Sequence, residues 1–138
     1  HKGNQASPVT KFTKEAQETG IIRIFEGSDR ITRDFIHVYD VVEIMLRLAD
    51  RSCLQGSSMQ TCSPIFNVGT GVAVSFQRIA ELIAEKVGNT VIETIAFPDH
   101  LKTHYQYQTL ACLNKLKRKD VIQDGYNFTI IEDYIFQI

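Results

Sequence analysis

Arg33 is the residue of this sequence whose chemistry is hardest to explain by packing alone. It opens the stretch RDFIHV, in which Phe35, Ile36 and Val38 have the apolar character of a buried strand. A guanidinium stays protonated and offers a planar fork of N–H donors that matches carboxylate or phosphate oxygens. Burying it without an anion would be costly. The sequence leaves two partners open, a carboxylate in a surface ion pair and a phosphate.

The stretch NVGTGVAV, residues 67–74, stands where a dinucleotide-binding fingerprint would stand, after an apolar run and before a helical pattern. The fingerprint G-x-G-x-x-G needs its third glycine at the position of Val74. The sequence therefore lacks the dinucleotide-binding fingerprint at this point. We interpret Gly69 and Gly71 as parts of a tight strand-to-helix turn.

His100 and His104 are four residues apart, which is the spacing of paired zinc ligands on a helix. The zincin motif has glutamate after its first histidine, but this sequence has Leu101 there. Pro98 and Asp99 also favour a loop at this point. We predict no metal site here, and no nucleophile elbow G-x-S-x-G occurs anywhere in the sequence.

The elements that must position these residues alternate between helix and strand. Two helices are predicted with clear boundaries, because each starts at a capping serine and ends at a glycine. They run from Ser7-Pro8 to Gly20 and from Ser75 to Gly88. Asp40 with Glu43 three residues later resembles a capping box and predicts a third helix start. Further segments are predicted as strands at 21–25, 34–38, 65–68 and 91–97, a polar loop at 51–63, a turn at Asp124-Gly125, and helices at 110–116 and, after a Thr129 cap, 130–136. This alternation predicts an α/β fold.

Composition limits the classes of function that are open to the chain. Its 138 residues suit one domain or a piece of a larger one, and 43% are hydrophobic and 22% charged. The net charge of −1, and a basic run at 114–119 spaced by leucines, argue against nucleic acid. No apolar run approaches the ~18 residues of a membrane span. Three cysteines without CxxC spacing favour free thiols in a reducing cytoplasm. The abrupt polar opening HKGNQAS suggests that His1 is an arbitrary cut.

Several stretches of the chain resemble a known family. RDFIHVYDVVEIM (33–45), FNVGTG (66–71) and VSFQRIAELIAE (74–85) resemble the extended short-chain dehydrogenase/reductases, or NAD-dependent epimerase/dehydratases, that act on nucleotide sugars. Within that family the chain is similar to the ADP-heptose 6-epimerases, on the stretches HKGNQAS (1–7), FEGS (25–28), FPDHLKTHYQYQT (97–109) and DGYNF (124–128). The resemblance implies that residues 1–138 are the C-terminal substrate-binding domain of a Rossmann-type enzyme. The N-terminal NADP-binding domain would be absent from this chain.

The resemblance also implies a set of site residues. Arg33 would hold the diphosphate of the substrate with a bidentate contact, and Lys2, in the HKG stretch, would be the catalytic group of this chain. Asp40 is left as a helix cap. The substrate-binding residues implied by the resemblance are Asn4, Lys11, Phe25, Glu26, Gly27, Ser28, Arg33 and Tyr105.

The activity implied by the resemblance is the inversion of carbon 6 of ADP-heptose, through oxidation and reduction by NADP, for lipopolysaccharide core synthesis. The cofactor NADP would be bound mainly by the missing domain, so the isolated chain is expected to be inactive. The expected partners are an ADP-sugar substrate and further copies in a homo-oligomer, with neither nucleic acid nor membrane, in the cytoplasm. Two alternatives stay open: a nucleotide-sugar 4-epimerase or 4,6-dehydratase, and a non-catalytic module that binds sugar nucleotides.

Overall fold

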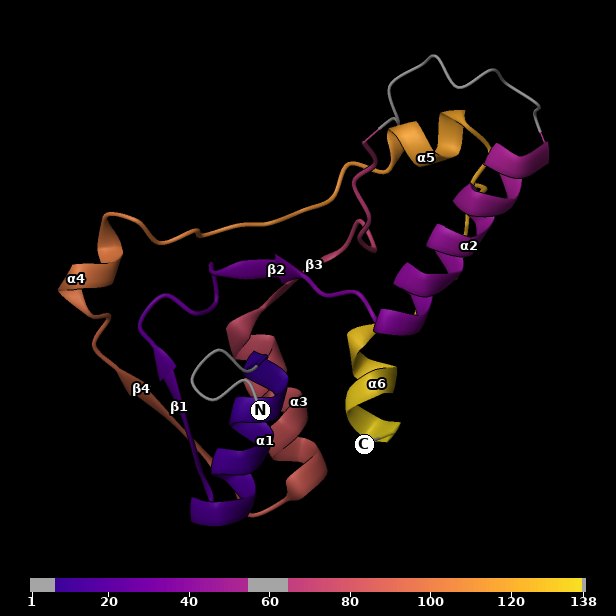
Figure 1. Cartoon of the computed structure of the whole chain (residues 1–138). Coiled ribbons are helices and arrows are strands. Elements are labelled where there is room, and N and C mark those ends of the chain that lie inside the picture. Colours follow the sequence, from indigo (N-terminus) through magenta and orange to yellow (C-terminus); the bar gives the residue numbers. More distant parts are fainter. Residues whose placement is uncertain (1–6, 55–64, 138) are drawn as a thin grey trace. The chain divides into compact units, whose positions relative to one another are not determined.

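The computed structural model describes residues 7–54 and 65–137, which fold as two compact units (Figure 1). Unit 1 comprises His1–Arg33, Ala73–Thr109 and Glu132–Ile138, and unit 2 comprises Asp34–Val72 and Leu110–Ile131. Helices and short strands alternate along the chain, so the predicted α/β class is confirmed. The assignment of the whole chain to one substrate-binding domain stays a prediction.

Two helices of unit 1 have the boundaries that their capping residues predict. In α1 (Pro8–Thr19) the Ser7 hydroxyl accepts the N–H of Val9, and Gly20 ends the helix with a left-handed φ of 65°. In α3 (Phe76–Val87) the Ser75 hydroxyl accepts the N–H of Arg78 at 3.1 Å, and Gly88 follows the last turn. These signals are local, which is why the sequence alone predicted them.

The strands of the described residues form two small sheets. Strand β1 (Ile21–Phe25) pairs in parallel with β4 (Val91–Ile95), in the register Ile21↔Val91 to Phe25↔Ile95. Strand β2 (Thr32–Asp34) pairs with β3 (Ala73–Ser75), which leads directly into α3. The one-turn helix α4 (Asp99–Lys102) follows β4.

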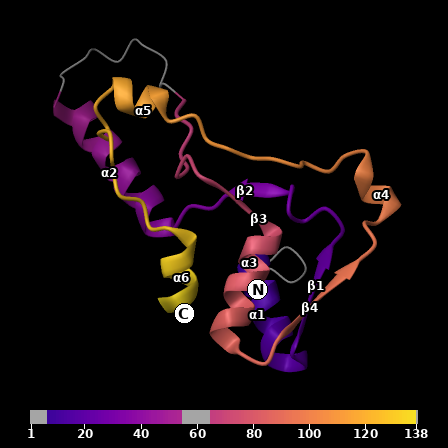
Figure 2. The ribbon, with the colours of Figure 1, turned by 180° about the vertical axis from the view of Figure 1, so that it is seen from behind.

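The core of unit 1 lies between its helices and its parallel strands. Helices α1 and α3 lie side by side and both contact β1, an arrangement visible from two sides (Figures 1 and 2). The last helix, α6 (Ile131–Gln137), adds the fully buried Ile135. The other buried apolar residues of this unit are Val9, Phe12, Ala16, Ile22, Ile24, Ile31, Ile79, Ala80, Leu82 and Ile83.

Unit 2 has a much smaller core, between the long helix α2 (Val38–Leu54) and the short helix α5 (Asn114–Arg118). The helix predicted at 110–116 from its leucine spacing begins only at Asn114, so Leu110 lies outside it and is exposed, whereas Leu116 lies in it and is buried. The buried cluster consists of Ile44, Leu116, Val121 and Ile122, with Leu48, Phe66, Val68, Leu113, Tyr126 and Phe128 packed around it.

The structure corrects the predicted elements around Asp34. The strand predicted at 34–38 ends at Asp34, because its partner β3 has only three residues, and 35–37 take no regular structure. Residues 65–68 likewise form no strand. Helix α2 extends to Leu54, into the segment predicted as a polar loop.

The predicted capping role of Asp40 is wrong. Helix α2 begins two residues earlier, at Val38, where the His37 ring nitrogen Nδ1 accepts the N–H of Tyr39 at 3.3 Å. Asp40 is instead buried, and its carboxylate accepts the backbone N–H of Thr129 at 3.0 Å. It therefore joins α2 to the segment before α6, a long-range role that a local pattern cannot reveal.

Candidate functional site

The guanidinium of Arg33, in β2, is held by two hydrogen bonds and two aromatic rings. Its Nη1 donates to the carbonyl oxygen of Thr32 at 2.8 Å, and its Nη2 donates to the carbonyl oxygen of Gln106. The guanidinium carbon lies 5.4 Å from the ring centre of Phe76 and 5.7 Å from that of Tyr105. Cation–π contacts of this length fix the plane of the fork and weakly stabilise its charge.

No carboxylate neutralises this guanidinium among the described residues. None of the ion pairs in that part of the chain includes Arg33. Its neighbour Asp34 is engaged by backbone N–H groups instead. Of the two partners that the sequence left open, the surface ion pair is therefore not found in the described structure. A positive charge held by neutral dipoles and rings is well suited to an anion.

The segment that carries Tyr105 is tied to β2 by backbone hydrogen bonds. The N–H of Thr32 donates to the Tyr107 carbonyl at 2.9 Å, and the N–H of Thr109 donates to the Thr32 carbonyl at 3.1 Å. Thr32 and Gln108 form a parallel bridge. These bonds keep Tyr105 beside Arg33, although the two residues are far apart in sequence.

Four aromatic rings form a cluster that reaches Arg33 through Tyr105. Phe97 lies at their centre, 5.1 Å from Phe25, 4.9 Å from Tyr105 and 6.3 Å from Tyr107 between ring centres. Phe97 and Tyr107 are stacked, whereas Phe97 and Tyr105 meet edge to face. Burial raises the pKa of the Tyr105 phenol above its ordinary value, and the charge of Arg33 opposes this shift only in part. Tyr105 is therefore a neutral hydrogen-bond donor at physiological pH.

The FEGS stretch forms a tight turn at the end of β1, in which each residue has a different structural role. Ser28 is buried, and both its N–H and its hydroxyl donate to the Phe25 carbonyl, at 3.1 and 2.6 Å. Gly27 has a φ of 79°, a conformation that side-chain-bearing residues rarely adopt. Glu26 is exposed, and its N–H donates to the Ile95 carbonyl. The turn therefore brings Phe25 to the aromatic rings, while the hydroxyl of Ser28 serves the turn itself.

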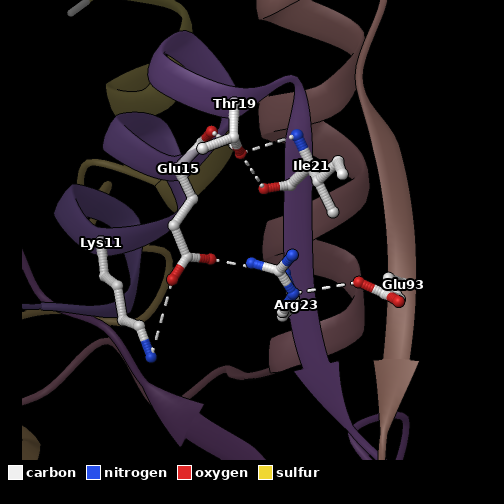
Figure 3. Close-up of polar contacts among 6 residues, drawn as sticks. All are labelled: Lys11, Glu15, Thr19, Ile21, Arg23 and Glu93. Carbon is white, nitrogen blue, oxygen red and sulfur yellow. Dashed lines mark hydrogen bonds and ion pairs between the residues drawn. The ribbon is translucent and has the colours of Figure 1, made fainter.

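Lys11 lies in a different polar network, on the exposed side of α1 (Figure 3). Its Nζ is 3.8 Å from a carboxylate oxygen of Glu15, whose other oxygen accepts the N–H of Arg23 at 3.3 Å. Arg23 in turn pairs with Glu93 of β4 at 3.0 Å. The structure shows no contact that joins Lys11 to Arg33, so its substrate-binding role stays a prediction. The predicted positions Lys2 and Asn4 lie outside the described residues.

The glycine turn at 69–71 does not fit a cofactor pyrophosphate. The backbone N–H groups of Thr70 and Gly71 already donate to the Asp34 carboxylate, at 2.7 and 3.0 Å. The Thr70 hydroxyl donates to the same carboxylate at 2.6 Å, and the N–H of Ala111 does so at 3.0 Å. A Cβ on Gly69 would come within 2.5 Å of that carboxylate. The N–H groups of this turn therefore bind the carboxylate of Asp34, and they are not free to bind the pyrophosphate of a cofactor.

The histidine pair shows no sign of a metal centre in the described structure. His100 belongs to the one-turn helix α4, where a loop was predicted, and His104 follows it with its N–H bonded to the Leu101 carbonyl. Within residues 7–54 and 65–137, no group of three or more His, Cys, Asp or Glu side chains could hold a metal ion. The same ranges include no helix long and apolar enough to cross a membrane.

Sequence reasoning missed one ring at Arg33 and two rings that pack on Tyr105. Phe76 was assigned only to the start of α3, yet its ring covers the guanidinium. Phe97 and Tyr107 lie in the stretch that resembles the ADP-heptose epimerases, and they join Tyr105 in the aromatic group. The dense run of aromatic residues in FPDHLKTHYQYQT was a usable signal for the last two. Nothing local pointed to Phe76.

Comparison with known proteins confirms the resemblance stated from the sequence. The chain is 39% identical, over 122 residues, to the ADP-L-glycero-D-manno-heptose-6-epimerase of Alkalilimnicola ehrlichii, a match that covers 85% of this chain and 36% of that protein. The chain thus spans about a third of the length of this curated relative. No family model matches.

Two solved structures show the same fold over nearly the whole chain. The Helicobacter pylori ADP-L-glycero-D-manno-heptose-6-epimerase matches 99% of this chain and 37% of its own, with a TM-score of 0.71 and 20% identity. An NAD-dependent NDP-hexosamine 5,6-dehydratase of tunicamycin biosynthesis matches 94% of this chain and 37% of its own, with a TM-score of 0.68 and 16% identity. The fold is therefore that of one part of larger nucleotide-sugar enzymes.

Proposed function

We propose that this chain is the substrate-binding part of a nucleotide-sugar epimerase that inverts carbon 6 of ADP-heptose. The identity to a curated epimerase of that activity supports the reaction, and the fold match to the same enzyme of another bacterium agrees with it. The proposal includes the site residues Lys2, Asn4, Lys11, Phe25, Glu26, Gly27, Ser28, Arg33 and Tyr105. It also includes a cytoplasmic, homo-oligomeric intact enzyme.

The observation that carries the proposal is the orientation of Arg33. Its guanidinium is held by two carbonyls and two rings, and no ion pair of the described residues neutralises it. A diphosphate brings oxygens in the geometry that the fork can bind. The neighbouring rings of Phe25, Phe97 and Tyr107 offer flat apolar surfaces for the rest of a nucleotide sugar.

The redox chemistry of the proposed reaction belongs to a nicotinamide cofactor, for which we propose NADP. The described residues do not fit its pyrophosphate, because the glycine turn at 69–71 is saturated by Asp34. We therefore propose that the cofactor is bound by parts of the intact enzyme outside these 138 residues. The chain alone is expected neither to bind NADP tightly nor to turn over substrate.

The decisive experiment changes Arg33 in the intact enzyme and measures the affinity for ADP-heptose by calorimetry. Arg33→Ala should weaken binding by about 1.5–3 kcal/mol, the range for hydrogen bonds to charged groups, or roughly 10- to 150-fold. Arg33→Lys should recover only part of this loss, because one ammonium cannot replace the planar fork.

Arg23→Ala is the matched control, because it removes an exposed arginine of the same unit that pairs with Glu93. It should leave the affinity unchanged. If Arg33→Ala lowers the melting temperature but not the affinity, Arg33 only holds the structure together. UDP-sugars serve as the second ligand set, and a preference for them would favour the 4-epimerase or 4,6-dehydratase alternative.

A further inference from the structure

The first two residues of α3, Phe76 and Gln77, contact the loop that joins β1 to β2. The N–H of Phe76 donates to the Ile31 carbonyl at 3.0 Å, and the N–H of Gln77 donates to the Ser28 carbonyl at 3.2 Å. An α-helix has no internal acceptor for the N–H groups of its first turn, so the loop carbonyls satisfy donors that the helix cannot. The loop that leads into β2 and Arg33 is thereby attached to α3 at two points.

Helix α3 is a firm support for this loop, because its own position in unit 1 is fixed by packing. It contacts both α1 and β1, and its start is held by the Ser75 hydroxyl, which accepts the N–H of Arg78 at 3.1 Å. The buried residues of α3 are Ile79, Ala80, Leu82 and Ile83. Side chains on packed elements keep a more precise position than side chains on loops. Phe76, the partly buried first residue of this helix, therefore has a fixed place beside the loop.

The ring of Phe76 restricts a side chain that is otherwise long and flexible. It lies 5.4 Å from the guanidinium carbon of Arg33, within the distance of about 6 Å over which an aromatic face attracts a cation. An arginine has several rotatable bonds, and a ligand that binds it has to order them. The carbonyls of Thr32 and Gln106 accept two of the five N–H donors of the guanidinium. The ring and these two carbonyls thus order Arg33 before a ligand reaches its other donors.

We propose that Phe76 is a positioning residue, which holds the Arg33 guanidinium ready for the diphosphate of a nucleotide sugar. It acts on the ligand only through Arg33. Tyr105, whose ring is also near this guanidinium, differs because the family resemblance makes it a substrate contact itself. The inference rests on the proposed function in taking Arg33 as the diphosphate contact, and it adds a residue that neither a local pattern nor the resemblance indicated.

A purely structural role for Phe76 leads to a different expectation. A ring that only fills space can be replaced by another ring of nearly the same shape, whatever its charge distribution. A cation–π contact instead depends on the negative charge of the ring face. Fluorine atoms on the ring withdraw that charge and change the shape little. A fluorinated phenylalanine at position 76 therefore separates the two roles.

The test introduces trifluorophenylalanine in place of Phe76 in the intact enzyme and measures the affinity for ADP-heptose by calorimetry. We expect the affinity to fall about two- to tenfold, the cost of ordering one long side chain on binding, with an unchanged melting temperature. In an Arg33→Ala background the same replacement should change the affinity no further, because the group that the ring positions is missing. Trifluorophenylalanine in place of Phe12 is the matched control. It alters a buried ring of the same unit, in α1, and should leave the affinity unchanged.

Three results would overturn the proposal. An affinity that the fluorinated ring leaves unchanged, while Arg33→Ala lowers it, would show that Phe76 only packs; the proposed function would then stand without this inference. The same loss with and without Arg33 would show that the ring acts by another route. A gain in affinity would show that Phe76 holds Arg33 away from the ligand. A failure of the proposed diphosphate contact appears separately, as an Arg33→Ala variant that binds ADP-heptose normally.

Discussion

Four hydrogen bonds converge on the Asp34 carboxylate in the described part of unit 2. It accepts the N–H of Thr70, of Gly71 and of Ala111 and the hydroxyl of Thr70, at 2.6 to 3.0 Å. It thereby ties the end of β2 to two segments that follow it at long range. We predict that Asp34→Ala destabilises the chain far more than removal of an ordinary surface carboxylate.

The magnitude follows from the surroundings of each donor. The N–H groups of Thr70 and Ala111 are partly buried, and each should cost about 1–2 kcal/mol when its acceptor is lost. The N–H of Gly71 is exposed and regains a water molecule, and the Thr70 hydroxyl keeps the Val72 carbonyl as an acceptor at 3.3 Å, so these two donors add little. The expected loss is therefore about 2–4 kcal/mol in the free energy of unfolding.

Urea denaturation followed by far-ultraviolet circular dichroism measures this loss. Asp124→Ala is the matched control, because it removes a 91% exposed carboxylate of the same unit that pairs with Lys117. Exposed ion pairs of this kind contribute little to stability. The reasoning is refuted if Asp34→Ala and Asp124→Ala lose the same stability, since the four bonds would then contribute nothing beyond a surface ion pair.

Three further predictions can be tested in the same chain or in its intact parent. Burial raises the pKa of Asp34, but the Thr70 hydroxyl and the N–H groups of Ala111, Thr70 and Gly71 outweigh it, so its pKa lies below the ordinary value. The stability that ionised Asp34 contributes should thus be complete above about pH 4 and lost as the pH falls through its lowered pKa. Acid titration of the Asp34→Asn variant should not show this loss of stability. Gly69→Ala should lower the free energy of unfolding by about 1–3 kcal/mol through overpacking, because the new Cβ would lie 2.5 Å from Asp34. Gly125→Ala is the control, because a Cβ on Gly125 meets nothing within 4 Å. In denaturation of the double variant, Asp34→Ala should relieve part of the loss caused by Gly69→Ala, and strictly additive losses would count against the contact. Lys2→Met in the intact enzyme should lower kcat on the order of 10²- to 10⁴-fold with substrate still bound, and steady-state kinetics that show a raised KM with normal kcat would instead make Lys2 a phosphate contact.

Local sequence signals were sufficient to predict helix boundaries wherever a side chain bonds to backbone groups a few residues away. Ser7 and Ser75 cap the helices they precede, and Gly20 and Gly88 end them, as the sequence predicts. A side chain that bonds an N–H two or three residues away leaves its signature within a few positions. The strands predicted at 21–25 and 91–97 are found at 21–25 and 91–95, because apolar residues bounded by turn residues suffice to locate them.

The sequence alone also identified Arg33 as unusual, but it could not choose between its two candidate partners. In the described structure its guanidinium is held by Gln106 and Phe76, which lie far from Arg33 in sequence and reach it only in the folded chain. The resemblance to a family supplied Tyr105 but not Phe97 or Tyr107. Sequence patterns identify residues with unusual chemistry, and the fold decides what surrounds them.

Asp34 and Asp40 show most plainly what only the tertiary structure decided. From local spacing, one looked like the first residue of a strand and the other like a helix cap. In the fold both carboxylates accept backbone N–H groups from distant segments, Asp34 from Thr70, Gly71 and Ala111, and Asp40 from Thr129. A carboxylate has the same local pattern whether it caps its own helix or satisfies a remote loop. The difference arises only in the fold, where the partly buried N–H groups of Thr70, Ala111 and Thr129 need an acceptor.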